Sequence, residues 1–238
     1  MLSKNQIKLI TRLKQKKYRL QYGLFSVEGA KTIKELLQSH LELHALYTTE
    51  TFNIDAKDEV LISENDLKRI SFLTTPNKAL AIFKIPDSKP IKNNQLVVAL
   101  DSIRDPGNLG TIIRLCDWFG ITDLVCSKET VDCFNPKVIQ ATMGSITRVH
   151  VSYIDLKTFL KETKLPVFGA FMEGENVYKT ELPNKGILVM GNEANGVSKE
   201  IEAVITKKIS IPQFGDIQET ESLNVATATA ILLSEFRR

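Results

Sequence analysis

From residue 95 onward, apolar runs of strand length alternate with segments of helical periodicity. The runs are mostly apolar without alternating polar positions, which is typical of strands buried on both faces of a sheet. Strands are expected at residues 96–100, 123–126, 148–151, 166–171 and 186–190, and helices at residues 109–119, 136–143, 156–162, 198–204 and 223–236. This alternation predicts an α/β fold with a mainly parallel sheet covered by helices on both faces.

The first part of the chain has a different order of elements. A basic helix is expected at residues 3–17, strands at 24–28, 45–47 and 80–84, and further helices at 30–38 and 64–71. Residues 85–90 read IPDSKP, and two prolines so close together interrupt regular structure. We therefore expect two domains, residues 1–89 and residues 90–238.

Charge distinguishes the two parts. All charged side chains in residues 1–20 are basic, although the net charge of the 238-residue chain is only +3. Such a run indicates either a solvated helix face or a surface for RNA phosphates, and the sequence leaves both open. The apolar runs are too short to cross a bilayer, so a cytoplasmic protein without membrane contact is expected.

The cysteines suggest no metal or disulfide chemistry. Cys116, Cys126 and Cys133 form no CxxC pair and are odd in number. His40 and His44 lie four residues apart but outside the segments that carry candidate chemistry, which favours surface residues over metal ligands. No metal site is therefore predicted, and the cysteines are expected to be small buried apolar residues.

Candidate chemistry begins in residues 100–114, LDSIRDPGNLGTIIR. A strand is expected to turn at Pro106 and Gly107 into a helix that opens near Asn108. Gly110 and Arg114 are four residues apart and share one helix face. A guanidinium on an otherwise apolar helix needs an anionic partner, which is either a carboxylate of the protein or a bound phosphate.

A second segment, residues 186–198, reads GILVMGNEANGVS. A buried strand is expected to end in a loop that contains Gly191, Glu193 and Gly196. Glycines allow the backbone to approach a flat ligand closely. Taken alone, the segment is better explained by an ordinary strand-to-helix turn with an exposed glutamate.

A third segment, residues 209–230, reads ISIPQFGDIQETESLNVATATA. A short strand is expected to end at Pro212, and Ser222 is expected to cap a helix that begins at Leu223. The small residues of this helix permit close packing, and a tightly packed terminal helix explains them without any functional role.

In order and together, these segments resemble the three motifs of the SpoU (TrmH-type) family of ribose 2′-O-methyltransferases, in the SPOUT class. The resemblance covers most of the chain after residue 90, and residues 17–37, KYRLQYGLFSVEGAKTIKELL, resemble the family's small substrate-binding domain of ribosomal-protein-like fold. The motif positions are Asn108, Gly110 and Arg114, then Gly191, Glu193 and Gly196, then Ile211, Pro212, Ser222, Leu223 and Asn224.

The resemblance implies a homodimeric enzyme that uses S-adenosylmethionine to methylate a ribose 2′-hydroxyl of structured RNA. It further implies a deep trefoil knot in the C-terminal domain, which forms the cofactor pocket. The residues that it places at the cofactor are Ala170, Phe171, Gly191, Gly196, Ile211 and Leu223.

The resemblance also assigns Arg114 a part in catalysis. Because a guanidinium normally stays protonated, we expect Arg114 to hold the adjacent phosphate and stabilise the developing alkoxide rather than to remove the proton. Asn108, Glu193, Ser222 and Asn224 are expected to orient the nucleotide and Arg114.

Several alternatives remain beside this hypothesis. The sizeable N-terminal domain favours ribosomal RNA as the substrate, with transfer RNA as the alternative. A non-catalytic RNA-binding dimer is a third possibility. A Rossmann-type methyltransferase or dehydrogenase would need a GxGxxG turn, and a nucleotide triphosphatase would need a P-loop; the sequence contains neither motif.

Overall fold

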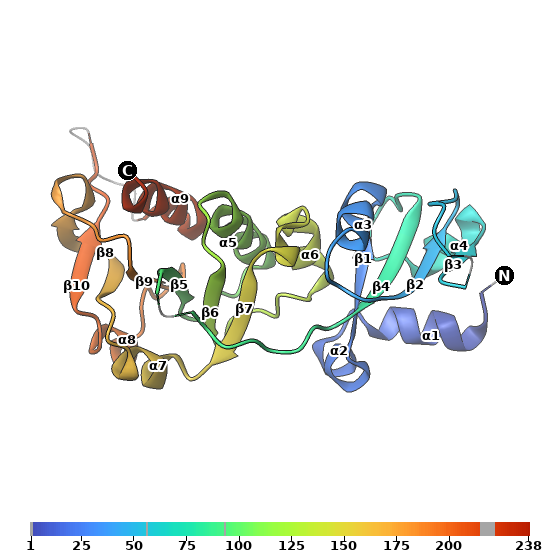
Figure 1. The fold of residues 1–238 in the computed structure, drawn as a ribbon, viewed down its shortest axis with the longest axis horizontal. Coiled ribbons are helices and arrows are strands. Elements are labelled where there is room, and N and C mark those ends of the chain that lie inside the picture. Colours follow the sequence, from blue (N-terminus) through green and yellow to red (C-terminus); the bar gives the residue numbers. More distant parts are fainter. Residues whose placement is uncertain (1, 56, 93, 215–221) are drawn as a thin grey trace. The chain divides into compact units, whose positions relative to one another are not determined.

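The computed structural model describes residues 2–55, 57–92, 94–214 and 222–238. The chain forms two compact units (Figure 1). The first unit comprises Met1–Ser88 and Asp132–Thr147, and the second comprises Lys89–Val131 and Arg148–Arg238. Residues 132–147 thus interrupt the second unit and pack with the first. Whether function divides between residues 1–89 and 90–238 stays a prediction.

The second unit contains a six-stranded sheet in the order β10-β8-β9-β5-β6-β7. Every neighbouring pair of these strands is parallel, as the sequence predicted. The strands are β5 (Leu96–Leu100), β6 (Asp123–Ser127), β7 (His150–Ile154), β8 (Val167–Asn176), β9 (Gly186–Met190) and β10 (Lys207–Ser210).

Helices cover both faces of this sheet. Helices α5 (Pro106–Trp118) and α9 (Val225–Phe236) lie on one side, and α7 (Leu156–Glu162) and α8 (Lys199–Glu202) lie on the other (Figure 1). Every residue of β5, β6 and β9 is buried, because both faces of these strands are covered. The predicted α/β architecture is therefore confirmed.

Helix α5 begins earlier than expected. Asp105 caps it by accepting a hydrogen bond from the Asn108 backbone N–H at 2.7 Å, and Pro106 occupies the first turn. The expectation of a turn at Pro106 and Gly107 before the helix was wrong, because proline is well suited to the first helical position.

The first unit contains a four-stranded mixed sheet in the order β1-β4-β2-β3. The strands are β1 (Leu24–Glu28), β2 (Leu43–Thr48), β3 (Glu59–Leu61) and β4 (Ala79–Lys84), and the helices are α1 (Lys4–Arg12), α2 (Lys16–Tyr22), α3 (Ala30–Leu37), α4 (Glu64–Ile70) and α6 (Pro136–Thr142).

The expected basic helix at residues 3–17 is two helices, because buried Arg19 stabilises a break between them. Arg19 is 2% exposed and donates from Nη1 to the backbone oxygens of Leu13 and Lys14 at 2.8 and 2.9 Å. Its Nε donates to the Asp132 carboxylate at 2.8 Å. Residues 132–147 therefore supply the counter-charge for a buried cation of the first unit.

All three cysteines are buried, as expected, and none of them forms a disulfide bond. None of the helices in the described ranges is long and apolar enough to span a membrane. The described residues also contain no cluster of three or more side chains suited to hold a metal ion.

Candidate active site

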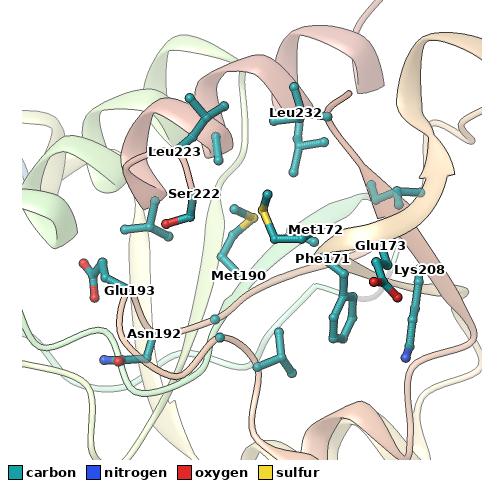
Figure 2. Close-up of a pocket in the computed structure, with 18 of the residues that line it drawn as sticks. Phe171, Met172, Glu173, Met190, Asn192, Glu193, Lys208, Ser222, Leu223 and Leu232 are labelled. Atoms are coloured by element: carbon teal, nitrogen blue, oxygen red, sulfur yellow. The ribbon is translucent and has the colours of Figure 1, made fainter. Parts of the chain in front are cut away.

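A cavity of about 960 Å³ opens in the second unit where β8, β9, β10 and the start of α9 meet (Figure 2). This volume lies within the range of small-molecule sites. Phe171, Met190 and Leu232 are among its apolar lining residues. The six residues expected at the cofactor all line it: Ala170, Phe171, Gly191, Gly196, Ile211 and Leu223. Their proposed role in binding remains a prediction, but the structure brings them to one cavity.

A change of register between β8 and β10 creates one wall. Lys208 pairs with Gly169, whereas the next residue, Ile209, pairs with Glu175. Residues 170–174 therefore have no partner on β10, and residues 170–173 line the cavity instead. Gly174 allows β8 and β10 to approach each other again, because a Cβ at this position would lie only 2.9 Å from the Lys208 backbone.

The loop after β9 folds tightly back on itself. Asn192 and Gly196 exchange backbone hydrogen bonds of 2.9 and 2.8 Å, and Gly196 has a φ of +65°. A Cβ at Gly191 would lie 2.3 Å from the Gly196 and Val197 backbone. The loop geometry itself therefore requires glycine at both positions, in addition to any approach of a ligand.

The loop after β5 supports this loop from outside the cavity. The Asp101 carboxylate accepts from the Ser198 backbone N–H at 2.7 Å, and Asn192 Nδ2 donates to the Ser102 backbone oxygen at 2.7 Å. Sequence reasoning missed Asp101 and Asn192. Their position directly after two buried strands was the available signal, because ligand sites in parallel sheets lie at those strand ends.

One residue from each of the three motif segments joins a hydrogen-bond chain. Asn108 Nδ2 donates to Glu193 Oε1 at 2.5 Å, and Asn224 Nδ2 donates to Asn108 Oδ1 at 3.0 Å. Glu193 lines the cavity, so Asn108 and Asn224 support its wall from behind. The structure thus brings together three of the five residues expected in catalysis.

Asn224, and not Ser222, caps α9. Its Oδ1 accepts from the backbone N–H groups of Ala226 and Thr227 at 3.0 and 3.2 Å. The expected cap at Ser222 was wrong, because asparagine is at least as good a capping residue and its Nδ2 remains available to Asn108. Ser222 is exposed and lines the cavity, and its expected role in orienting the nucleotide stays a prediction.

Arg114 belongs neither to this hydrogen-bond chain nor to the cavity lining. It is exposed on α5 and is not among the residues that line the cavity of its own chain. Within the described ranges the Arg114 guanidinium has no hydrogen bond or ion pair, and only its backbone takes part in the bonding of α5. No carboxylate in the described part of the chain therefore pairs with this arginine, which favours an external anion.

The charge of the cavity suits a cationic ligand. Among its described lining residues are the carboxylates of Glu173, Glu193 and Glu202 and the single cation Lys208. S-adenosylmethionine carries a sulfonium, an ammonium and one carboxylate, and so has a net positive charge. The apolar lining residues, the glycine-rich wall and the acidic side chains all fit this cofactor.

Comparison with known proteins finds relatives that are similar to this chain in sequence. Residues 4–81 match the MRM3-like substrate binding domain. The 23S rRNA (guanosine(2553)-2′-O)-methyltransferase RlmP of Bacillus subtilis is 29% identical over 99% of this chain and 97% of its own.

Solved structures extend the likeness to the whole fold. A protein assigned to the TrmH family of RNA methyltransferases, from Porphyromonas gingivalis, is 40% identical, with a TM-score of 0.90 over 100% of this chain and 98% of its own. The AdoMet-bound rRNA methyltransferase from Sinorhizobium meliloti is 29% identical, with a TM-score of 0.87 over 100% of this chain and 96% of its own. Residues 95–234 match the SpoU rRNA Methylase family, and the chain therefore belongs to that family.

Proposed function

We propose that this protein transfers a methyl group from S-adenosylmethionine to a ribose 2′-hydroxyl of ribosomal RNA. The observation that carries the proposal is the Glu193–Asn108–Asn224 hydrogen-bond chain, which unites all three motif segments at the wall of one cavity. The full-length similarity to a Bacillus enzyme named for 23S rRNA favours ribosomal over transfer RNA.

The reaction requires orientation of the sugar and loss of its hydroxyl proton. S-adenosylmethionine supplies an activated methyl group on its sulfonium. We assign orientation of the nucleotide to Glu193 and Ser222 at the cavity wall, with Asn108 and Asn224 fixing Glu193. Ala170, Phe171, Gly191, Gly196, Ile211 and Leu223 would hold the cofactor.

We assign Arg114 to the RNA phosphate beside the target sugar and to the developing negative charge on its oxygen. Its planar guanidinium suits bidentate binding of phosphate. Because Arg114 does not line the cavity of its own chain, we propose that the active site is completed in a homodimer. The deep trefoil knot and a cytoplasmic location remain expectations of the same proposal.

The first unit is proposed to hold the RNA. The Arg12 guanidinium lies 4.9 Å and the Lys17 ammonium 5.8 Å from the centre of the Tyr18 ring. Lys14 and Lys16 are exposed on the same stretch of chain. Aromatic rings among cations are suited to stack on bases while the cations bind phosphates.

Mapping of 2′-O-methyl groups tests the choice of substrate. Ribosomal and transfer RNA from cells with and without this gene would be compared nucleotide by nucleotide. We expect one ribosomal site to lose its methyl group and to regain it when the gene is restored. Loss confined to transfer RNA would establish the alternative substrate, and identical maps would contradict the proposal.

A further inference from the structure

The cavity has two polar ends that differ in charge. Figure 2 shows Asn192 and Glu193 at one side, and Phe171, Glu173 and Lys208 grouped at the other. The first end is the one connected to Asn108 and Asn224. Glu173 and Lys208 belong neither to the three motifs nor to the proposed catalytic residues, so they have no role in the function proposed above.

Lys208 is the only cation among the described residues that line the cavity. Residues 215–221, which lie outside the described ranges, read GDIQETE and contain no lysine or arginine. Lys208 Nζ lies 4.8 Å from the centre of the Phe171 ring and forms an ion pair with Glu202. An ammonium has three donors, so this pairing leaves capacity for a further anion.

The strand irregularity that forms the cavity also brings these two charges to it. Glu173 belongs to the stretch of β8 that has no partner on β10, and Lys208 is the last residue of β10 before the register changes. The neighbouring charges, Lys207 and Glu175, pair with each other at 2.9 Å and do not line the cavity.

On these grounds, and resting on the proposed cofactor, we propose that Lys208 and Glu173 bind the amino-acid arm of S-adenosylmethionine. Lys208 donates to the α-carboxylate, and Glu173 accepts from the α-ammonium. The carboxylate is the only anionic group of this cofactor, and Lys208 is the only lining cation in the described part of the chain. Glu202 holds the lysine side chain toward the cavity edge.

Two ligands that differ only in this arm test the proposal. S-adenosylhomocysteine has the amino-acid arm, whereas methylthioadenosine keeps the adenosine and thioether without it. Calorimetric titration of the full chain should show that Lys208→Met weakens S-adenosylhomocysteine binding by about 10-fold to 100-fold, the range for a charge-assisted hydrogen bond. Glu173→Gln should act in the same direction. Neither change should alter methylthioadenosine binding.

Matched variants on the same two strands serve as controls. Lys207→Met and Glu175→Gln remove equal charges outside the cavity and should leave both affinities unchanged, whereas Lys208→Arg should keep most of the affinity for S-adenosylhomocysteine. Equal weakening of both ligands by Lys208→Met would overturn the inference, as would a wild-type protein that binds both ligands equally well. If the wild type binds neither ligand, the proposed cofactor itself is wrong.

Discussion

Arg114 is a single exposed guanidinium whose role can be tested with little risk to the fold. Because it has no partner in the described part of its own chain and does not line the cavity, its removal should leave folding and cofactor affinity intact. We expect Arg114→Ala to lower methyl transfer by about 100-fold or more, as for the loss of a group that stabilises a developing oxyanion.

Single-turnover methyl transfer measures the effect on the rate, and titration with S-adenosylhomocysteine measures the effect on cofactor affinity. Arg114→Lys keeps the charge but loses the planar fork, so its rate should fall between those of the wild type and the alanine variant. Turnover of Arg114→Ala at the wild-type rate would remove this residue from the catalytic machinery.

Glu28 provides a test of the pH dependence of stability in the first unit. Burial raises the pKa of Glu28 above its ordinary value of 4.5, against the opposing effect of hydrogen bonds from Ser71 and the Phe72 backbone. Its contribution to the free energy of unfolding is therefore full below pH 4.5 and is lost as the pH rises through the folded-state pKa.

Urea unfolding at several pH values, with wild type and Glu28→Gln compared, measures this contribution. The wild type should lose stability relative to the glutamine variant as the pH rises above 4.5. A relative gain of stability over the same range would contradict the stated direction of the pKa shift.

At the scale of elements, burial decided how well each segment could be predicted. Strands β5 and β9 are buried along their whole length and were predicted at their true bounds. Strand β3 was missed, because its three residues are partly exposed and form no apolar run. The break between α1 and α2 depends on Arg19 and Asp132, which are distant in sequence and show no periodicity.

The residues of the candidate site also differ in how well the sequence predicted them. Its glycines, Asn108, Asn224 and Glu193 were identified because they belong to motifs with a recognisable order. Lys208 and Glu173 were missed, since their position at the cavity follows from a register change between β8 and β10 that no local pattern reveals. Asn224 was assigned to the site, but its capping role required the structure.

The loop after β9 makes a separate prediction. A Cβ at Gly191 would lie 2.3 Å from the backbone of Gly196, so Gly191→Ala must displace the loop that lines the cavity. We expect affinity for S-adenosylhomocysteine to fall by at least about tenfold, as for the loss of one good hydrogen bond to a charged ligand.

Gly120→Ala is the matched control for this substitution. Gly120 has a φ of +67° but open space around its Cβ position, and it lies outside the cavity. It should cost about 1–2 kcal/mol of stability from backbone strain alone, without a change in affinity. Undiminished affinity in Gly191→Ala would show that the loop does not contact the cofactor.

For the whole molecule, the main consequence of the structure is that the first unit is not continuous in sequence. Residues 132–147 supply Asp132 to buried Arg19 and Phe134 to Phe25, whose rings lie 4.7 Å apart. A fragment of residues 1–89 would leave Arg19 without its carboxylate, and breaking a buried ion pair costs about 3–5 kcal/mol.

That fragment should therefore unfold at a markedly lower urea concentration than the first unit within the intact chain. Hydrogen exchange of β1 and β4 amides in both proteins measures the difference region by region. Equal protection in the fragment and the intact chain would show that residues 132–147 contribute nothing to the stability of the first unit.

The central claim is transfer of a methyl group to a ribose oxygen of ribosomal RNA, and one experiment tests it directly. The purified protein is incubated with S-adenosylmethionine labelled in its methyl group and with ribosomal RNA from cells that lack the gene. The RNA is then hydrolysed in alkali. We predict label in an alkali-resistant dinucleotide, since a 2′-O-methyl group blocks cleavage of the adjacent phosphodiester. Label found on a base, or no transfer at all, would contradict the account.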